Sequence, residues 1–482
     1  MQLGAAVTER IPKSAVIALV AVGLLLAACL AYLSPGDFTS TTYLGGVLLI
    51  EVLIASVWLY KKVFFALTAV CFLFAGVDLP IGSFWVLIRW VFLGIGALVG
   101  FAFILKERGY KFGAFHLVAL FAVLAALVSA VVSRYSVVSS LKVLSLFLLF
   151  VYAATGARVA VSRRESRFFT GTLAGVEILV VVLAASTVMG IEIMGNPNSR
   201  GAIAGVVAAP LLLWGTLLPQ ERFSYQRRLL FYALAMYLTF ASQARASILA
   251  AFVSCVLLCL VLHQYRLLTQ GVVIIAILAA TGAILRPEAF SRTMSSMTST
   301  VVFKERGGAQ GVLASRKGPW QEAVDSIRQH FWFGTGFGTD DNGHDVTEET
   351  GKYSTVSAVA TEHGSSYLAI TSWVGFAGVL PFFALVVLIL RNIAKTLFWM
   401  WRTGNPSHPA VPLAMVMLAG LIHAFFEDWL FAPGYYLCFF YWSMAFVFVD
   451  QVRTLPLPAR ESLVLQPVAA VTRNLNVPAP VR

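Results

Sequence analysis

The chain has 482 residues, of which 59% are hydrophobic and only 12% are charged. Soluble domains carry about 25% charged residues, so this composition excludes a water-soluble globule. It also excludes a disordered chain, which needs low hydrophobicity and high charge. The five cysteines lie in apolar runs without a CxxC pair, which predicts small buried side chains. We therefore predict an integral membrane protein, whose formal net charge of +12 must be explained by where the cations lie.

Apolar runs of about 20 residues are long enough to cross a bilayer as helices. The sequence predicts such spans, in chain order, at 14–33, 42–60, 63–79, 84–105, 112–132, 139–157, 170–190, 201–218, 228–242, 244–262 and 269–285, and then near 366–391, 411–427 and 433–449. Some runs are short, 228–242 above all, so the total is about 12 to 14 helices. We predict an all-α, polytopic integral membrane helix bundle.

The chain divides into four parts by composition. Residues 1–285 form an N-terminal transmembrane bundle, and the polar interval 286–365 forms one long loop that carries short helices. Residues 366–450 contain the C-terminal transmembrane helices. The tail, 451–482, is rich in Pro, Val and Arg without a helical or strand period, which predicts a flexible extension.

The cations orient the predicted helices, because cytoplasmic loops retain Lys and Arg. Alternate loops of this chain contain them, at 61–62, 106–111, 158–167, 222–228 and 395–402, and so does the tail. The intervening loops at 34–41 and 80–83 contain none. This alternation predicts that both termini are cytoplasmic and that the 286–365 loop faces the other side. It also explains the net charge without a nucleic-acid surface.

Four polar segments stand out at the predicted external boundaries. The first is Gly195-Asn-Pro-Asn-Ser-Arg-Gly201, which presents Arg200 but is also ordinary turn and N-cap chemistry. The second is Ser242-Gln-Ala-Arg-Ala-Ser247, which places Arg245 at the membrane boundary. An arginine there either snorkels to the interface or meets an anion, and its fork of donors matches phosphate oxygens.

The third segment lies within the long loop. Apolar side chains at helical spacing over 319–333 predict an amphipathic helix that lies at the membrane interface. Ser315-Arg316-Lys317 precedes this helix, and Gly334-Thr-Gly-Phe-Gly338 follows it as a flexible turn. The glycines resemble a nucleotide-binding loop only superficially, because no strand precedes them.

The fourth segment, Thr361 to Leu368, contains His363 and Tyr367 where the loop re-enters the membrane. A lone histidine is more often structural than catalytic, so His363 becomes a candidate only in combination with other residues. No HExxH or paired His/carboxylate signature occurs, which predicts no metal site.

Two adjacent acids, Glu427 and Asp428, lie at the external end of the penultimate span, with His423 and Trp429 nearby. Acids at a membrane boundary cost free energy unless cations pair with them. The candidate partners are Arg245 and Arg316.

Together these segments resemble the O-antigen ligase / O-antigen polymerase superfamily of bacterial envelope glycan transferases. The resemblance covers roughly 190–430 and rests on the order and spacing of Asn196-Pro-Asn198, Ser242 to Ser247, Ser315-Arg316 to Gly338, and His363 to Leu368. It implies a glycosyltransferase in the bacterial inner (cytoplasmic) membrane with its active site facing the periplasm. The implied processes are lipopolysaccharide or exopolysaccharide synthesis, without a cofactor or a metal.

The resemblance also implies partners and residue roles. The implied donor is a glycan carried on undecaprenyl diphosphate (undecaprenyl pyrophosphate), and the implied acceptor is lipid A–core or a growing polysaccharide. The implied site residues are the general base His363, the diphosphate-binding Arg245, Arg316 and Arg200, and the supporting Glu427 or Asp428 and Tyr367. Gly364 departs from the family pattern, because many relatives have Asn or Ser after the histidine.

The chemistry implied by the family is reasonable for these residue types. Breaking a sugar–diphosphate bond needs stabilisation of the developing negative charge, which two arginines supply, and attack opposite the diphosphate inverts the anomeric carbon. The acceptor class stays open between ligase, polymerase and protein O-oligosaccharyltransferase.

A lipid-linked oligosaccharide flippase or transporter is the alternative from another class of protein. That alternative predicts charges along a path through the membrane, whereas the intramembrane charges of this chain are scattered. They are Glu51, Arg89, Lys142 and Glu177.

Overall fold

The computed structural model describes residues 41–77, 82–107, 110–191, 193–194, 197–219, 222–285, 314–339 and 364–456, with a few single residues before 33 and between 288 and 295. Most of the predicted span at 14–33 and most of the tail lie outside these residues, and so does His363. Every regular element in the described part is a helix, which confirms the predicted all-α class.

The first half of the chain forms a series of apolar helices joined by short turns. They are α2 (Thr41–Trp58), the π-helical η1 (Tyr60–Phe64), α3 (Phe65–Phe74), α4 (Gly82–Lys106), α5 (Ala114–Val132), α6 (Ser136–Tyr152), the π-helical η2 (Ala153–Ala157), α7 (Arg158–Val161) and α8 (Glu165–Val188).

The second half continues in the same way and includes the helix of the long loop. Its elements are α9 (Pro197–Ala202), the π-helical η3 (Ile203–Ala208), α10 (Ala209–Leu217), α11 (Arg222–Ala241), α12 (Arg245–Val261), α13 (Tyr265–Leu285), α15 (Ala314–Gln329), α16 (Ser366–Thr403), α17 (Ala410–Ala424) and α18 (Tyr436–Arg453).

The lengths of these helices support a polytopic membrane protein. Among the described residues, 6 helices are long and apolar enough to cross a bilayer, or up to 7 if one bent pair, Leu49–Trp58 with Tyr60–Phe74, is counted as one span. The helices α12 and α17 are apolar but shorter. The total of about 12 to 14 spans stays a prediction.

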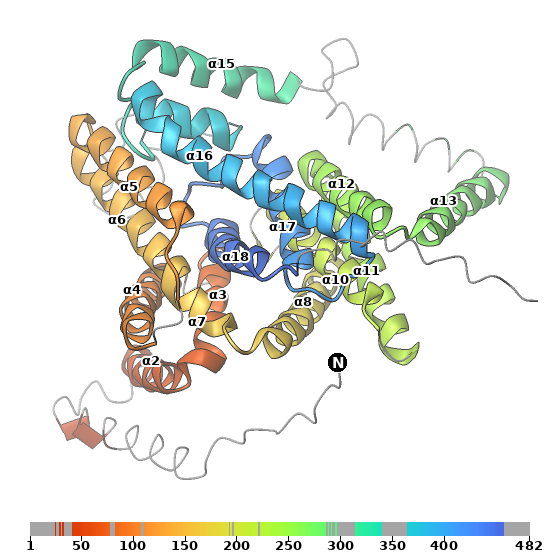
Figure 1. The fold of residues 1–482 in the computed structure, drawn as a ribbon, viewed down its shortest axis with the longest axis horizontal. Coiled ribbons are helices and arrows are strands. Elements are labelled where there is room, and N and C mark those ends of the chain that lie inside the picture. The colour runs from red at the N-terminus through yellow and green to blue at the C-terminus, as the bar shows by residue number, and fades with distance from the viewer. Residues whose placement is uncertain are drawn as a thin grey trace, which may run out of the picture.

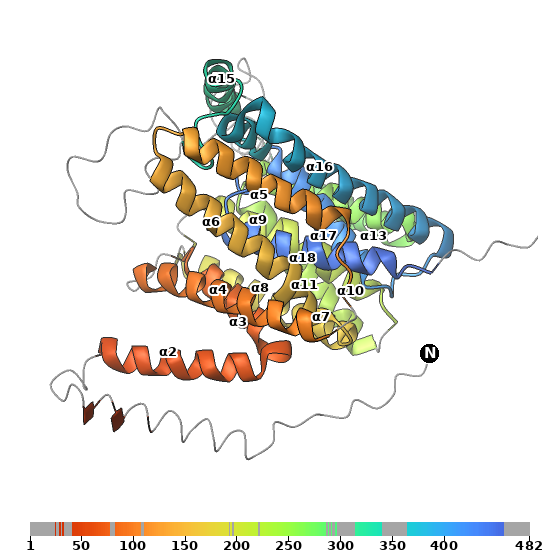
Figure 2. The same ribbon diagram turned by 60° about the vertical axis from the view of Figure 1, so that its left-hand side comes forward.

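Small side chains allow the long helices to pack closely. On α5, Ala119, Ala122, Ala126 and Ala130 are buried, whereas Leu120 and Phe121 of the same helix are 47% and 52% exposed. The helix α5 runs beside α6 and α16 (Figures 1 and 2). Small residues at helix contacts with large apolar residues outside are typical of membrane helices, because lipid solvates the outer face.

The core of the bundle surrounds α18, which lies at the centre of the view in Figure 1. Its side chains are almost all buried, including Phe439, Tyr441 and Trp442. The helices α3, α6, α16 and α17 pack around it. A helix that is buried on all sides needs an apolar sequence all round, which α18 has until Asp450.

Two helices differ from the sequence-based boundaries. The helix α15 begins at Ala314, five residues before the predicted start, and contains Pro319 in its second turn. The helix α16 has 38 residues and continues to Thr403, beyond the predicted end at 391. The polar residues after 391 still have helical spacing, and hydropathy alone therefore underestimates the length of α16.

The polar ends of the helices form two groups. The start of α12, α16 and α18 and the end of α17 meet at one end of the bundle, named here the site end. At the opposite end, Lys61 pairs with Glu107, and Arg158 pairs with Asp450. We name this the basic end. Lys61, Glu107, Lys111, Arg158 and Arg164, from three of the predicted cytoplasmic loops, therefore meet at the basic end. The side of the membrane on which they lie stays a prediction.

Candidate functional site

The first two polar segments touch each other at the site end. Gly201 in α9 lies so close to Ser242 and Ala244 that a Cβ at Gly201 would collide with the Ser242 hydroxyl. The absence of a side chain at 201 therefore allows α9 to approach the turn before α12. Arg245 is the first residue of α12, so this contact places its backbone beside α9.

Arg316, in the third polar segment, pairs with one of the two adjacent acids near the end of α17. Arg316 of α15 forms an ion pair with Glu427, which lies between α17 and α18, and the two side chains are 13% and 19% exposed. An ion pair with this little exposure is screened less by water and salt than a surface pair is. Of the two candidate acids, Glu427 is thus the one that pairs with Arg316.

The two arginines of the site interact through their charges. Burial acts most strongly on the Arg245 guanidinium, and the charge of Arg316 adds to this effect. Two like charges destabilise each other unless an anion lies between or beside them. Glu427 supplies one negative charge to this pair of arginines, and a dianionic ligand would supply more.

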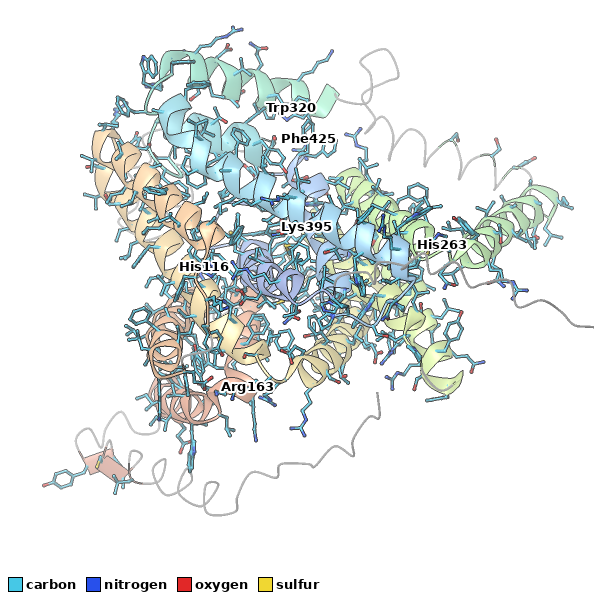
Figure 3. All side chains as sticks on the ribbon, viewed as in Figure 1. His116, Arg163, His263, Trp320, Lys395 and Phe425 are labelled. Atoms are coloured by element: carbon cyan, nitrogen blue, oxygen red, sulfur yellow. The ribbon has the colours of Figure 1, made fainter. Side chains whose placement is uncertain are left out.

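Gly364, in the fourth polar segment, is held against α15 of the third segment. Trp320 of α15 donates its indole N–H to the carbonyl oxygen of Gly364, with an Nε1–O distance of 3.0 Å. Figure 3 shows Trp320 beside Phe425, and the two rings meet edge to face with centroids 6.0 Å apart. Because Gly364 directly follows His363 in the chain, these contacts bring the neighbour of the predicted base to α15.

The departure at Gly364 has a structural reason. Gly364 has a φ of +63°, and a Cβ there would lie 3.2 Å from the Nη1 atom of Arg316. Glycine adopts this left-handed conformation without steric cost, and asparagine is the residue that tolerates it next best. Glycine therefore keeps the backbone conformation and lets Arg316 approach.

The start of α16 positions the acids. The Ser366 hydroxyl donates to the Glu427 carbonyl oxygen at 2.6 Å and accepts from the Leu430 N–H at 3.0 Å. Tyr367 donates its hydroxyl to the Leu421 carbonyl oxygen at 3.0 Å. Ser366 and Tyr367 therefore hold the 427–430 turn and the end of α17.

Arg200 points elsewhere. Its Nη1 atom donates to the Thr187 hydroxyl at the end of α8, with a distance of 3.0 Å. Its Nε atom is buried and has no hydrogen-bond partner among the described residues. The neighbouring Ser199 lies 3.3 Å from the Tyr435 hydroxyl, and its carbonyl oxygen accepts from Tyr436 at 3.1 Å. The first segment therefore also contacts the start of α18.

Tyr435 connects this contact with the acids. Its hydroxyl lies 3.3 Å from the Ser199 hydroxyl and 2.8 Å from the Tyr436 hydroxyl, and the charges of Glu427 and Asp428 act on it. A phenol can both donate and accept a hydrogen bond. It is a polar group beside both acids that the sequence pattern did not single out as functional.

A buried histidine joins the two sides of the site. His423 of α17 is 3% exposed, its Nδ1 accepts from the Trp429 indole at 2.7 Å, and its Nε2 lies 3.1 Å from the Ser247 hydroxyl. Because an indole N–H can only donate, the neutral ring carries its hydrogen on Nε2 and donates to Ser247. His423 thereby connects the segment of Arg245 to the turn of Glu427. Its clustering with Trp429 and the acids was the available signal in the sequence.

We expect His423→Leu to lower the free energy of unfolding by about 1–3 kcal/mol, because it leaves the buried indole N–H of Trp429 without a partner. His423→Gln keeps one acceptor and one donor and should restore part of this loss. Denaturant unfolding in detergent measures both variants. A leucine variant as stable as the parent protein would show that these hydrogen bonds contribute nothing to the site.

A glycine-rich loop anchors α15 to the bundle. The helix α16 is broken at Gly375, which has a φ of 65° and a ψ of −178°. Across this break the N–H groups of Thr335 and Gly336 donate to the carbonyl oxygens of Ser372 and Trp373, each at 3.0 Å. In return the N–H groups that follow the break donate to the turn after α15. They are Phe376 to Phe331 at 2.7 Å and Ala377 to Trp332 at 3.2 Å.

The same loop binds the first half of the chain. The hydroxyls of Ser133 and Ser139 donate to the carbonyl oxygens of Thr335 and Phe337, at 2.7 Å and 3.1 Å. Lys142, one of the scattered intramembrane charges, donates to the carbonyl oxygen of Gly338. The residues 334–338 are therefore a packed structural element between α5, α6 and α16, which corrects the expectation of a flexible turn.

No group of three His, Cys, Asp or Glu side chains in the described part of the chain is arranged to hold a metal ion. The described geometry brings Arg316 and Glu427 together next to Gly364, and the charge of Arg316 acts on Arg245. His363 itself lies outside the described residues.

Comparison with known families agrees with the sequence-based resemblance. Residues 230–383 match the model of the O-antigen ligase family. The matched part contains Arg245, Arg316, His363 and Tyr367, whereas Arg200, Glu427 and Asp428 lie outside it. No curated protein matches the chain. The family match supports a place for this chain in the O-antigen ligase/polymerase superfamily.

Proposed function

We propose that this chain, with its O-antigen ligase region, is a membrane glycosyltransferase that moves a glycan from undecaprenyl diphosphate onto an acceptor hydroxyl at the periplasmic face. The main support is the position of Arg316, which pairs with Glu427 and lies against Gly364, and whose charge acts on Arg245. These groups come from four separate segments of the chain and meet at one end of a bundle of apolar helices.

The arginines would bind the diphosphate of the donor. Guanidinium groups form paired, charge-assisted hydrogen bonds with phosphate oxygens. In the absence of a ligand the charges of Arg245 and Arg316 repel each other, and a diphosphate would relieve this repulsion. Because the site lies at the end of membrane helices, a lipid carrier can remain in the bilayer while its diphosphate reaches the arginines.

In the proposed reaction His363 accepts the proton of the acceptor hydroxyl. The acceptor oxygen then forms a bond to the anomeric carbon, and the bond from that carbon to the diphosphate oxygen breaks. The electron pair of the broken bond leaves with the diphosphate, whose charge the arginines stabilise. Attack from the opposite side inverts the anomeric carbon. These residues suffice for the step without a metal or a nucleotide.

The acceptor distinguishes the proposals that remain open. Lipid A–core would make the protein a ligase, a growing polysaccharide would make it a polymerase, and a protein hydroxyl would make it an O-oligosaccharyltransferase. We test these acceptors in parallel with the purified protein and a defined donor. A flippase moves the donor across a vesicle without breaking the sugar–diphosphate bond, and product analysis separates it from all three.

We expect Arg245→Lys to weaken donor binding by about 10- to 100-fold, because lysine keeps the charge but loses a charge-assisted hydrogen bond of about 1.5–3 kcal/mol. The measurement is the concentration dependence of transfer on the donor. Arg134→Lys is the matched control, since Arg134 is exposed in the turn between α5 and α6 at the same end. Equal effects of the two substitutions would contradict a specific role for Arg245.

A further inference from the structure

A cavity of about 380 Å³ lies at the basic end, across the bundle from the candidate site. Its walls come from three parts of the chain: Glu107 with Tyr110 and Lys111, the stretch from α7 to the start of α8, and the end of α18. Figure 3 shows Arg163, at the lower edge of the view, across the molecule from Trp320 and Phe425 of the site end. A cavity of this size falls in the range of small-molecule sites.

The acids of the cavity already have partners. Asp450 accepts from Arg158 and lies 3.6 Å from the Nη1 of Arg453. Glu107 pairs with Lys61, and the Glu165 carboxylate accepts from the backbone N–H of Arg163 at 3.3 Å. Two of the three carboxylates that line the cavity are therefore ion-paired, and the third accepts a backbone hydrogen bond.

The cations are in excess over these acids. Each guanidinium nitrogen of Arg158 already has an acceptor. Its Nε and Nη2 bind Asp450, and its Nη2 also binds the Lys111 carbonyl oxygen at 3.0 Å. Its Nη1 binds the Ala154 carbonyl oxygen at 3.1 Å. The side-chain nitrogens of Lys111 and Arg163 form no hydrogen bond or ion pair with any residue that the structure describes. Both residues are exposed and line the cavity.

We propose that this cavity binds a phosphate ester with a net negative charge, whose phosphate oxygens contact Lys111 and Arg163. Arginine and lysine are the residues that proteins use for phosphate, as a fork of donors and as a point charge. The hydroxyls of Tyr110, Ser162 and Thr454 line the same cavity and can bind the polar substituent of the ester, while Val161 and Val447 form an apolar wall.

Two sources can present this chemistry. The cavity lies at the ends of membrane helices, where the headgroup of an anionic phospholipid can enter from the bilayer. It is also accessible to a soluble phosphate ester. In either case the ligand is distinct from the donor and acceptor of the proposed transfer reaction, which act at the other end of the bundle.

The test measures ligand-dependent thermal unfolding of the full chain in detergent, which reports affinity because only the folded state binds. One arm adds phosphatidylglycerol, with phosphatidylcholine as the zwitterionic comparison, and the other adds glycerol 3-phosphate. The variant Lys111→Gln/Arg163→Gln removes both cations from the cavity. The variant Arg266→Gln/Lys395→Gln removes two exposed cations outside it and is the matched control.

The parent protein and the control variant should bind phosphatidylglycerol or glycerol 3-phosphate at least about tenfold more tightly than the cavity variant does, because each charge-assisted hydrogen bond is worth about 1.5 kcal/mol or more. A response to the lipid alone would identify a headgroup site, and a response to both would identify a site open to water. Equal affinities of the cavity and control variants would overturn the proposal. So would equal stabilisation by phosphatidylcholine and phosphatidylglycerol.

Discussion

Replacing His363 by alanine is expected to lower the rate of glycan transfer by about 10²- to 10⁴-fold, the usual contribution of a general base. The acceptor hydroxyl would then have to lose its proton without a positioned acceptor. Donor binding should change little, because the arginines hold the diphosphate. The measurement is single-turnover transfer by the purified variant with saturating donor and acceptor.

The matched control is His344→Ala, a substitution of the same kind in the same loop, which should leave the rate unchanged. The amount of each variant in the membrane must also equal that of the parent protein. Full activity of the His363 variant would remove the proposed base. Parallel losses in both variants would show that the loop tolerates no change, and the assignment of His363 would lose its support.

Replacing Gly375 by alanine is expected to destabilise the protein by about 2–4 kcal/mol, since a strained backbone conformation costs about 1–3 kcal/mol and a steric clash adds to it. Gly375 has a positive φ, and a Cβ there would lie 2.5 Å from the backbone nitrogens of Phe333 and Gly334. The substitution would push the 334–338 loop away from α16. Because this loop anchors α15, Arg316 should move from Glu427 and transfer should fall with stability.

Gly175→Ala is the control for this substitution. Gly175 lies in α8, and a Cβ there would meet nothing within 4 Å. Alanine is the better helix former by about 0.8–1 kcal/mol, so this variant should be as stable as the parent protein or more so. Thermal unfolding in detergent measures both variants. Equal stability of the Gly375 and Gly175 variants would contradict the role of the break in α16.

The helices were predictable because apolar length is a local property. The predicted spans at 84–105 and 112–132 agree within two residues with α4 and α5 at both ends. The break in α16 was not predictable from the apolar run around Gly375, because that run has no polar interruption. The partners of the break are the backbone groups of residues 331–336, some 40 residues earlier in the chain. Hydrogen bonds between backbone groups so far apart in the chain leave no periodic pattern in the sequence.

The intramembrane charges illustrate the same limit. The sequence indicated only that Arg89, Lys142 and Glu177 are scattered. In the structure Arg89 donates to the Gly434 carbonyl oxygen at 2.6 Å, Lys142 binds Gly338, and Glu177 lies 3.5 Å from Arg227. Each of these three charges thus has a separate partner, and two of them hold loops of the site end. Composition predicts that such charges need partners, but only the fold decides which partners they have.

The candidate site was partly predictable for a related reason. Arg245, Arg316 and the late acids were identified because charge at an external boundary is costly and therefore informative. The positioning residues His423 and Ser366 were not identified as part of the site, because buried hydrogen bonds between helices depend on packing. Glu427 and Asp428 were equivalent in sequence, and the ion pair with Arg316 distinguishes them.

The most direct test is transfer by the purified protein in vesicles with a defined undecaprenyl-diphosphate glycan and candidate acceptors in the lumen and outside. The account predicts a glycan–acceptor product with an inverted anomeric carbon, together with released carrier diphosphate, and loss of both in the Arg316→Gln variant. Movement of intact donor across the vesicle with its sugar–diphosphate bond unbroken, and no product with any acceptor, would contradict it.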